Sequence, residues 1–70
     1  MEREYIESSM IISVGYDSER SILEIEFKSN GAIWQYFDFP EYLYYEFMEG
    51  SKGKNWHRMV KNQYSESQVG

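Results

Sequence analysis

The sequence predicts an α+β fold in which a three-stranded antiparallel β-meander is followed by a covering α-helix and a short C-terminal helix. Between residues 10 and 39, apolar and polar residues alternate in three runs separated by turn-forming residues, which indicates consecutive strands. After the single proline, Pro40, apolar residues recur at helical spacing up to Gly50. The chain has 70 residues and therefore room for one small domain.

The first two strands are predicted from a period of two. Residues 10–16 alternate so that Ile12 and Val14 share one face while Ile11 lies on the other. Residues 17–20 are polar and form the turn to the next strand. On the second strand, the alternating apolar residues that extend the inward face are Leu23, Ile25 and Phe27. Its opposite face carries glutamates and is expected to be acidic and exposed.

The third strand follows the dipeptide Asn30-Gly31, which favours a tight type I′ hairpin turn. Residues 32–39 then resume with aromatic, strand-favouring residues. A two-residue turn fixes the cross-strand pairs as Phe27 with Trp34 and Ile25 with Tyr36. A four-residue loop in the first hairpin likewise pairs Val14 with Leu23 and Ile12 with Ile25.

Two helices complete the expected fold. Pro40 is a favourable first helical residue, and the pattern predicts a helix from about Pro40 to Glu49 that covers the sheet. The segment 50–53 ends this helix, and Asn55 is expected to cap a second, shorter one. The inward stripe of that second helix consists of Trp56, Met59 and Val60.

The composition restricts the classes of protein to consider. The chain has no cysteine, which excludes a disulfide scaffold and thiolate metal sites, and the 19% aromatic content predicts a folded chain. No apolar stretch approaches the roughly 18 residues of a membrane span, and the polar start does not read as a secretory signal. We therefore expect a cytoplasmic protein with no membrane partner. Residues 1–70 should form one domain with a core at about residues 8–64 and frayed ends. For residues 1–9 the sequence leaves a short helix, an edge strand and a disordered lead open.

Catalytic interpretations find little support in the sequence. His57 is the only histidine, and no triad is assembled around it. Glu24 and Glu26 project from one strand face, but carboxylates at this spacing more often make a strand soluble than act as an acid/base pair. We expect no catalytic residue, no metal site, no cofactor and no enzyme activity.

A basic segment near the C-terminus is the first candidate binding site. Lys52, Lys54 and Arg58 are interleaved with Gly53 and Trp56, although the whole chain carries a net charge of −5. Cations next to a ring suit a phosphate group or single-stranded RNA, because they neutralise the backbone while the ring stacks on a base. The alternative is that Trp56 belongs to the core and that the cations form the solvated face of the last helix.

Aromatic residues on the third strand are the second candidate. Trp34 and Tyr36 could stack bases as sheet aromatics do in RNA-binding modules, but the same alternation places them on the face that the helix covers. Ile33 and Phe37 lie on the opposite face. They motivate an alternative function, in which this face of the sheet mediates protein–protein interaction or self-association.

From about Ser8 to Tyr64 the chain resembles the KTSC domain, which is named for a C-terminal domain of some lysyl-tRNA synthetases and also occurs as small stand-alone bacterial and phage proteins. The tyrosine-x-tyrosine centre usual in that family is Trp34-Gln35-Tyr36 here, so stacking or packing is retained while the first hydroxyl is lost. The resemblance rests on Ser8-Ser9, Ile12, Val14-Gly15-Tyr16-Asp17, Leu23, Ile25, Phe27, Gly31, Phe39-Pro40, Tyr44, Phe47, Ser51, Gly53, Trp56 and Val60.

What the resemblance implies about function is RNA binding, suggested by the fusion of the family to a tRNA-charging enzyme. On matching positions it implicates Trp34 and Tyr36 at the centre and Ser51, Lys52 and Gly53 at the turn between the helices. We therefore expect a non-catalytic binding module for RNA or a nucleotide phosphate. The expected binding residues are Trp34, Tyr36, Ser51, Lys52, Gly53, Lys54, Trp56 and Arg58. The alternative partner is a protein or a second copy of the chain.

Overall fold

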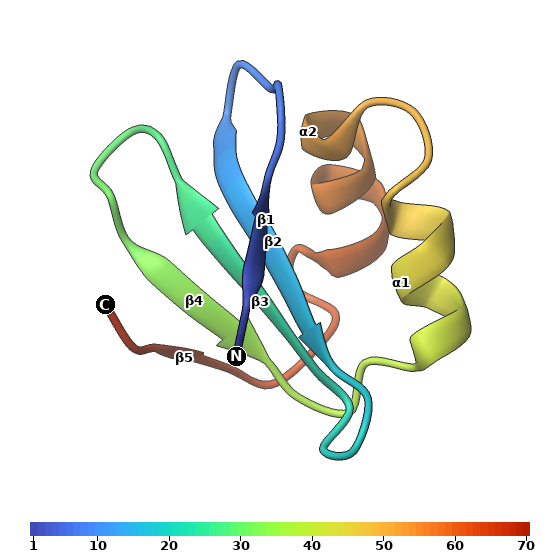
Figure 1. The fold of residues 1–70 in the computed structure, drawn as a ribbon. Coiled ribbons are helices and arrows are strands. Elements are labelled where there is room, and N and C mark those ends of the chain that lie inside the picture. Colours follow the sequence, from blue (N-terminus) through green and yellow to red (C-terminus); the bar gives the residue numbers. More distant parts are fainter.

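The computed structural model describes residues 1–70 and contains a five-stranded antiparallel sheet with the helices on one of its faces (Figure 1). Along the sheet the strands follow chain order. The elements are β1 (Arg3–Tyr5), β2 (Ile11–Asp17), β3 (Ile22–Phe27), β4 (Ile33–Tyr36), α1 (Glu41–Phe47), α2 (Lys52–Asn55), the π-helical turn η1 (Trp56–Val60) and β5 (Glu66–Gln68). The α+β class is confirmed, whereas the prediction of three strands is wrong because the sheet has five.

The two additional strands come from the chain ends. An edge strand was one of three possibilities left open for residues 1–9, whereas the residues after about Tyr64 were expected to be frayed. β1 pairs with β2, where Arg3 lies opposite Gly15, and β5 pairs with β4, where Glu66 lies opposite Tyr36. Each has 3 residues and no apolar alternation, so backbone pairing rather than side-chain pattern sets its place. Glycine is needed at position 15, because a Cβ there would lie 2.5 Å from the carbonyl oxygen of Glu2.

A β-bulge in β2 changes which residues enter the core. The pairing with β3 shifts between Ile11 and Ser13, so that one extra residue, Ile12, is accommodated in β2. Ile11 is fully buried as a result, while Ile12 is only half-buried. The prediction that Ile12 faces inward and Ile11 outward is therefore wrong, because strict alternation assumes an uninterrupted ladder.

Both hairpins pair two residues away from the predicted register, and a shift of two keeps the strand residues beyond the bulge on their expected faces. Val14 lies opposite Ile25, and Ile25 lies opposite Trp34. The second turn is longer than predicted: the Phe27 amide donates to the carbonyl of Ala32 at 2.9 Å, and only Gly31 has a positive φ. Asn30 instead accepts a hydrogen bond from the Ala32 amide at 3.0 Å, which stabilises the wider turn.

The second helix begins after Ser51 rather than at Asn55. The Ser51 hydroxyl accepts a hydrogen bond from the amide of Lys54, as an N-cap does. Asn55 is buried one turn later, and its side-chain amide donates to the carbonyls of Phe47 at 2.8 Å and Glu49 at 2.6 Å. The residue expected to start one helix therefore satisfies the C-terminal carbonyls of the helix before it.

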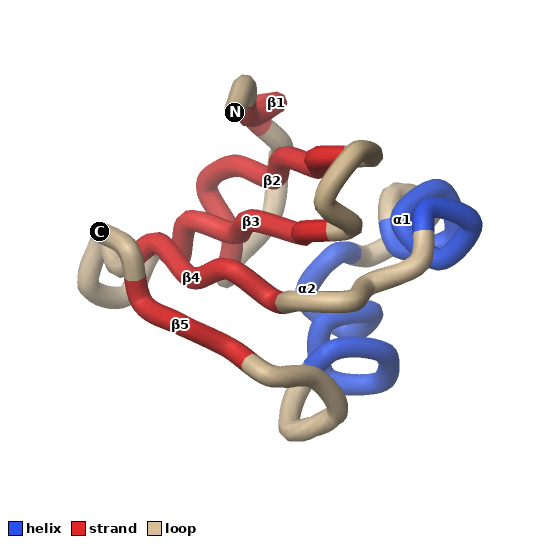
Figure 2. Tube along the Cα trace, turned by 90° about the horizontal axis from the view of Figure 1, so that it is seen from below, coloured by secondary structure: helices blue, strands red, loops and turns tan.

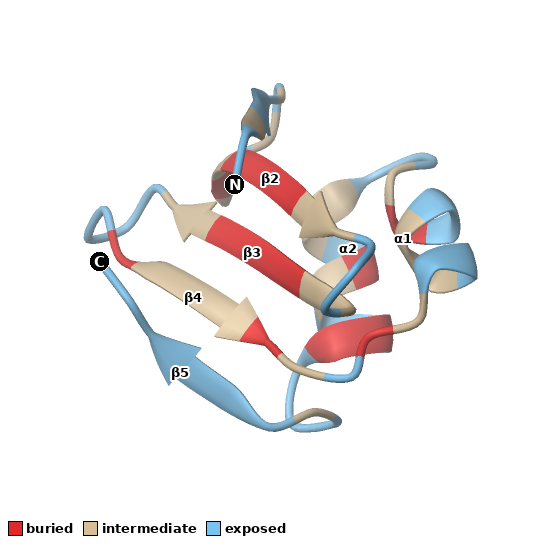
Figure 3. Cartoon of the chain, turned by 60° about the horizontal axis from the view of Figure 1, so that its bottom comes forward, coloured by how far each residue is buried: buried red, intermediate tan, exposed pale blue.

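The sheet and the helices form two layers (Figure 2), and the core residues lie between them. Buried residues gather at the centres of β2 and β3 and on the helix surface that faces them (Figure 3). The core residues are Ile11, Val14, Leu23, Ile25, Tyr36, Phe39, Phe47, Met59 and Val60. None of the helices is long and apolar enough to cross a membrane.

The opposite face of the sheet carries a network of polar side chains. Arg3 donates to the hydroxyl of Ser13 at 2.9 Å and forms an ion pair with Glu24. Gln35 donates to the other oxygen of Glu24 at 2.8 Å, and Ser13 donates to Glu26 at 2.9 Å. Glu24 is only 6% exposed, so the expectation of a freely solvated acidic face is wrong at this position. The network joins β1 through β4.

The network also sets the ionisation of Glu24. Burial alone would raise the pKa of this carboxyl, but hydrogen bonds from Gln35 and Arg3 together with the charge of Arg3 outweigh it, and the pKa lies below its usual 4.5. A carboxyl whose folded-state pKa is lowered stabilises the fold above its unfolded-state pKa. That stabilisation is lost as the pH falls through the lower, folded-state value.

The bulge predicts different costs for the same truncation at neighbouring positions. Ile11→Val should lower the free energy of unfolding by about 0.5–1.5 kcal/mol, because it removes a methylene from a closed core. Ile12→Val should change it by less than about 0.5 kcal/mol. Urea denaturation followed by far-UV circular dichroism measures both values. A larger loss for Ile12→Val would show that the ladder runs without the bulge.

The polar network predicts an acid-sensitive contribution to stability. Glu24→Gln should lower the free energy of unfolding at neutral pH by about 1–3 kcal/mol, because Arg3 loses its buried counter-charge. The difference in the free energy of unfolding between wild type and variant should become smaller as the pH falls below 4.5, where the wild-type carboxyl becomes protonated. Urea denaturation at a series of pH values measures this difference, and Glu49→Gln, at an exposed position, controls for the loss of a charge. A difference that does not depend on pH would contradict the role given to Glu24.

Candidate functional site

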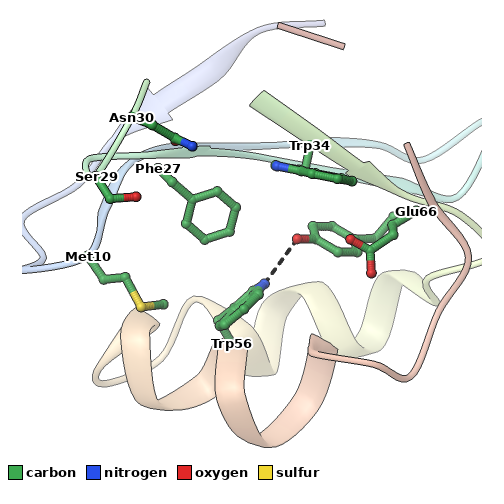
Figure 4. Close-up of a pocket in the computed structure, with 8 residues that line it drawn as sticks. Met10, Phe27, Ser29, Asn30, Trp34, Trp56 and Glu66 are labelled. Carbon is green, nitrogen blue, oxygen red and sulfur yellow. Dashed lines mark hydrogen bonds between the residues drawn. The ribbon is translucent and has the colours of Figure 1, made fainter. Parts of the chain in front are cut away.

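An open groove lies between the β3–β4 hairpin and the second helix. It encloses about 360 Å³ and is lined mainly by the rings of Phe27, Trp34, Tyr36 and Trp56, and we call it the aromatic groove (Figure 4). It opens because the helices cover the sheet over Tyr36, which is 1% exposed, and leave Trp34 half-buried. The Trp34 indole therefore packs against the edge of the core and leaves part of its surface facing the groove.

Three elements position the aromatic rings. Phe27 ends β3, Trp34 and Tyr36 project from the same face of β4, and Trp56 begins η1. The Trp56 indole N–H donates to the Tyr36 hydroxyl at 3.2 Å, and the rings of Phe27 and Trp56 meet edge to face at a centroid distance of 5.3 Å. Such pairs prefer an edge-to-face arrangement because of the ring quadrupole. The groove wall is thus fixed by a hydrogen bond and a ring contact.

The Tyr36 hydroxyl keeps its proton at neutral pH. Burial raises its pKa above the usual 10.0, the hydrogen bond from Trp56 opposes this, and the carboxylate of Glu66 raises it further. A protonated hydroxyl can accept from Trp56 and still donate to a neighbour. Tyr36 therefore orients the groove wall rather than acting as a base.

Polar residues flank the aromatic rings at the two ends of the groove. Ser29 and Asn30 come from the β3–β4 turn at one end, and Glu66 comes from the start of β5 near the other (Figure 4). Met10, which precedes β2, contributes an apolar edge. The arrangement of an apolar, ring-lined interior with a few polar groups is typical of small-ligand sites.

The structure brings together only part of the predicted site. Trp34, Tyr36 and Trp56, chosen for separate reasons, all line the aromatic groove. The basic residues do not gather into one cluster. Lys52 donates to the carbonyl of Gly50 at 3.1 Å, and Arg58 lies 3.7 Å from the carboxylate of Glu46.

The remaining predicted residues serve the second helix. Ser51 caps it, Lys54 is exposed, and Gly53 lies where an added Cβ would be 3.7 Å from Met10. Lys61, a cation outside the predicted site, lies over the ring of Trp56 at 5.7 Å from its centroid. Among the lysines and arginines, Lys61 is therefore the one whose charged group lies over a ring of the aromatic groove.

Several residues of the groove escaped the sequence analysis. Phe27 was placed correctly on the inward face but was assigned to the core alone. Asn30 was interpreted only as a turn residue, and Ser29 was not considered. Glu66 lies in a segment that carried no structural signal, and only its pairing with β4 brings it beside Tyr36.

The residues behind the alternative function lie on the helix-free face of the sheet. Ile33 and Phe37 are both half-buried. The Ile33 amide donates to the carbonyl of Gly70 at 3.1 Å, and the Phe37 amide donates to the carbonyl of Ser65 at 2.9 Å. The C-terminal segment therefore occupies the edge of β4 beside both residues.

Comparison with known proteins places the chain in a family. The model of the KTSC domain matches residues 7–64. An uncharacterised protein of Stutzerimonas stutzeri is 37% identical over 65 residues, which cover 91% of this chain and 90% of that protein. The crystal structure of a KTSC domain protein from Yersinia pestis matches with a TM-score of 0.93 and 34% identity, covering 99% of this chain and 97% of that one. The resemblance drawn from the sequence is confirmed: the chain belongs to the KTSC domain family.

Proposed function

We propose that this protein is a non-catalytic binding module that takes one base of single-stranded RNA, or a nucleotide, into the aromatic groove. The observation that carries the proposal is the half-buried Trp34 indole, which faces a groove walled by further rings. A base gains about 1–3 kcal/mol by stacking on an aromatic side chain. The groove offers such a ring without any rearrangement of the core.

The size of the aromatic groove suits a single base or nucleotide. Its volume of about 360 Å³ falls at the lower end of the range for small-ligand sites. A longer stretch of RNA would have to follow the outer surface, where the net charge of −5 opposes a polyanion. Binding should therefore be local, with one base held in the groove.

Three lysines flank Trp56 along the chain and are the candidates to bind a phosphate outside the groove. Lys61 lies over Trp56, and Lys52 and Lys54 precede Trp56 on the same short helical segment. Arg58 is already close to Glu46 and contributes less free charge. A phosphate held by two or three lysines gives a small number of ionic contacts, so the salt dependence of binding should be shallow.

The role of Trp34 can be tested with a matched pair of variants. Trp34→Leu should weaken binding of a single-stranded hexaribonucleotide of mixed sequence by about 5–100-fold, because the stacking surface is lost. Trp34→Phe should retain most of the affinity because it keeps a ring. Isothermal titration calorimetry measures both, and Tyr42→Leu controls for loss of an exposed aromatic residue outside the groove. Equal affinity of wild type and Trp34→Leu would refute the proposal.

The same assay separates the phosphate contacts from stacking. Reversing the charge of Lys52 and Lys54 to glutamate should weaken binding and flatten its salt dependence while the melting temperature stays unchanged. Arg20→Glu reverses a charge in the distant β2–β3 turn and serves as the control. An unchanged affinity after the double reversal would remove the basic segment from the binding site.

Self-association is the second candidate function. No helix covers the far face of the sheet, where Ile22, Ile33 and Phe37 are half-buried (Figure 2). A second copy of the chain could bury these side chains by packing the two helix-free faces together.

This alternative predicts a change of oligomeric state. Phe37→Ser should convert a dimer into a monomer, because it removes a large apolar side chain from the helix-free face. Sedimentation equilibrium of wild type and variant measures the mass of the assembly directly. A wild type that stays monomeric at millimolar concentration would exclude self-association.

A further inference from the structure

We propose that the aromatic groove selects a guanine base and that Glu66 is the residue that determines this selectivity. The inference rests on the proposed function and specifies the ligand of the same groove. Its basis is the carboxylate of Glu66, which lines a groove otherwise formed mostly by aromatic and apolar side chains.

Backbone pairing sets the position of Glu66 in the fold, and its side chain is exposed to solvent. Glu66 is the first residue of β5 and lies directly opposite Tyr36 in the ladder with β4. Its carboxylate lines the groove (Figure 4) and is near enough to the Tyr36 hydroxyl for its charge to raise the pKa of that group. All three ion pairs of the protein lie elsewhere, so the carboxylate has no cationic partner of its own. Its acceptor oxygens remain available to a ligand.

A carboxylate distinguishes the four bases by the pattern of hydrogen-bond donors and acceptors that each base presents. An ionised carboxylate only accepts hydrogen bonds, and it binds best where two donors lie side by side. Guanine presents adjacent N–H donors at N1 and at the exocyclic amino group. Adenine, cytosine and uracil each place an acceptor beside their donor, and that acceptor would face the charge of Glu66. The phosphate is repelled by the same charge, which orients the base inward.

The shape of the groove favours a base over a small organic cation. A guanidinium group would also pair with Glu66, but it would fill only a small part of about 360 Å³. Lys61 already lies 5.7 Å from the centroid of the Trp56 ring, and its charge disfavours a second cation beside that ring. A purine spans more of the groove and leaves Ser29 and Asn30, which line the far end, to contact its other edge or the sugar.

The test compares four nucleoside monophosphates with inosine monophosphate by isothermal titration calorimetry. Wild type should bind GMP about tenfold or more tightly than AMP, CMP or UMP, since charge-assisted hydrogen bonds discriminate by this order. Inosine monophosphate lacks the exocyclic amino group and should fall between GMP and AMP. Glu66→Gln should weaken GMP binding about tenfold and leave AMP binding unchanged. Glu49→Gln removes an exposed carboxylate elsewhere and should alter neither affinity.

The outcomes distinguish this inference from the proposed function. If all nucleotides bind with equal affinity, and this affinity falls in Trp34→Leu but not in Glu66→Gln, guanine selectivity is refuted while the proposed binding function is retained. If no nucleotide binds but methylguanidinium binds in a Glu66-dependent manner, the groove is a cation site and both proposals fail. Unchanged melting temperatures of Glu66→Gln and Glu49→Gln establish that the comparison is made on folded protein.

Discussion

The side-chain amide of Asn55 is the contact that holds the helical layer together. It donates to the carbonyls of Phe47 and Glu49 and so joins the end of α1 to the second helix. Helices of this length are only marginally stable in isolation, because nucleation is unfavourable and the few hydrogen bonds that form do not offset it. Trp56 follows Asn55 directly, so the contact that orders the helices also places one wall of the aromatic groove.

The two faces of the sheet are stabilised by different forces. One face buries aliphatic and aromatic side chains against the helices, and the other links four strands through Arg3, Ser13, Glu24 and their partners. The polar network ties down β1 at the place where Gly15 lets the chain approach closely. A chain of 70 residues without a disulfide thus orders its N-terminal strand by paired charges rather than by a larger core.

The candidate site was partly predictable because its rings lie where core and groove meet. Alternation assigned Trp34 and Tyr36 to the inward face, and helical spacing did the same for Trp56; both assignments are consistent with the structure. Whether an inward ring is enclosed depends on how far the helices extend, and no local pattern contains that information. The sequence predicted a binding site in the basic segment, but in the structure Arg58 lies beside Glu46 and Lys52 donates to the carbonyl of Gly50.

The sequence by itself determined the family, the α+β class and the face on which most strand residues lie, because side-chain periodicity and turn residues act locally. Only the tertiary structure decided that a bulge in β2 buries Ile11 in place of Ile12. It also decided that the two edge strands form and that Glu66 lines the groove. Each of these depends on pairing between segments distant in the chain. The backbone hydrogen bonds that create such pairs are available to nearly every residue, so they leave no signature in the order of side chains.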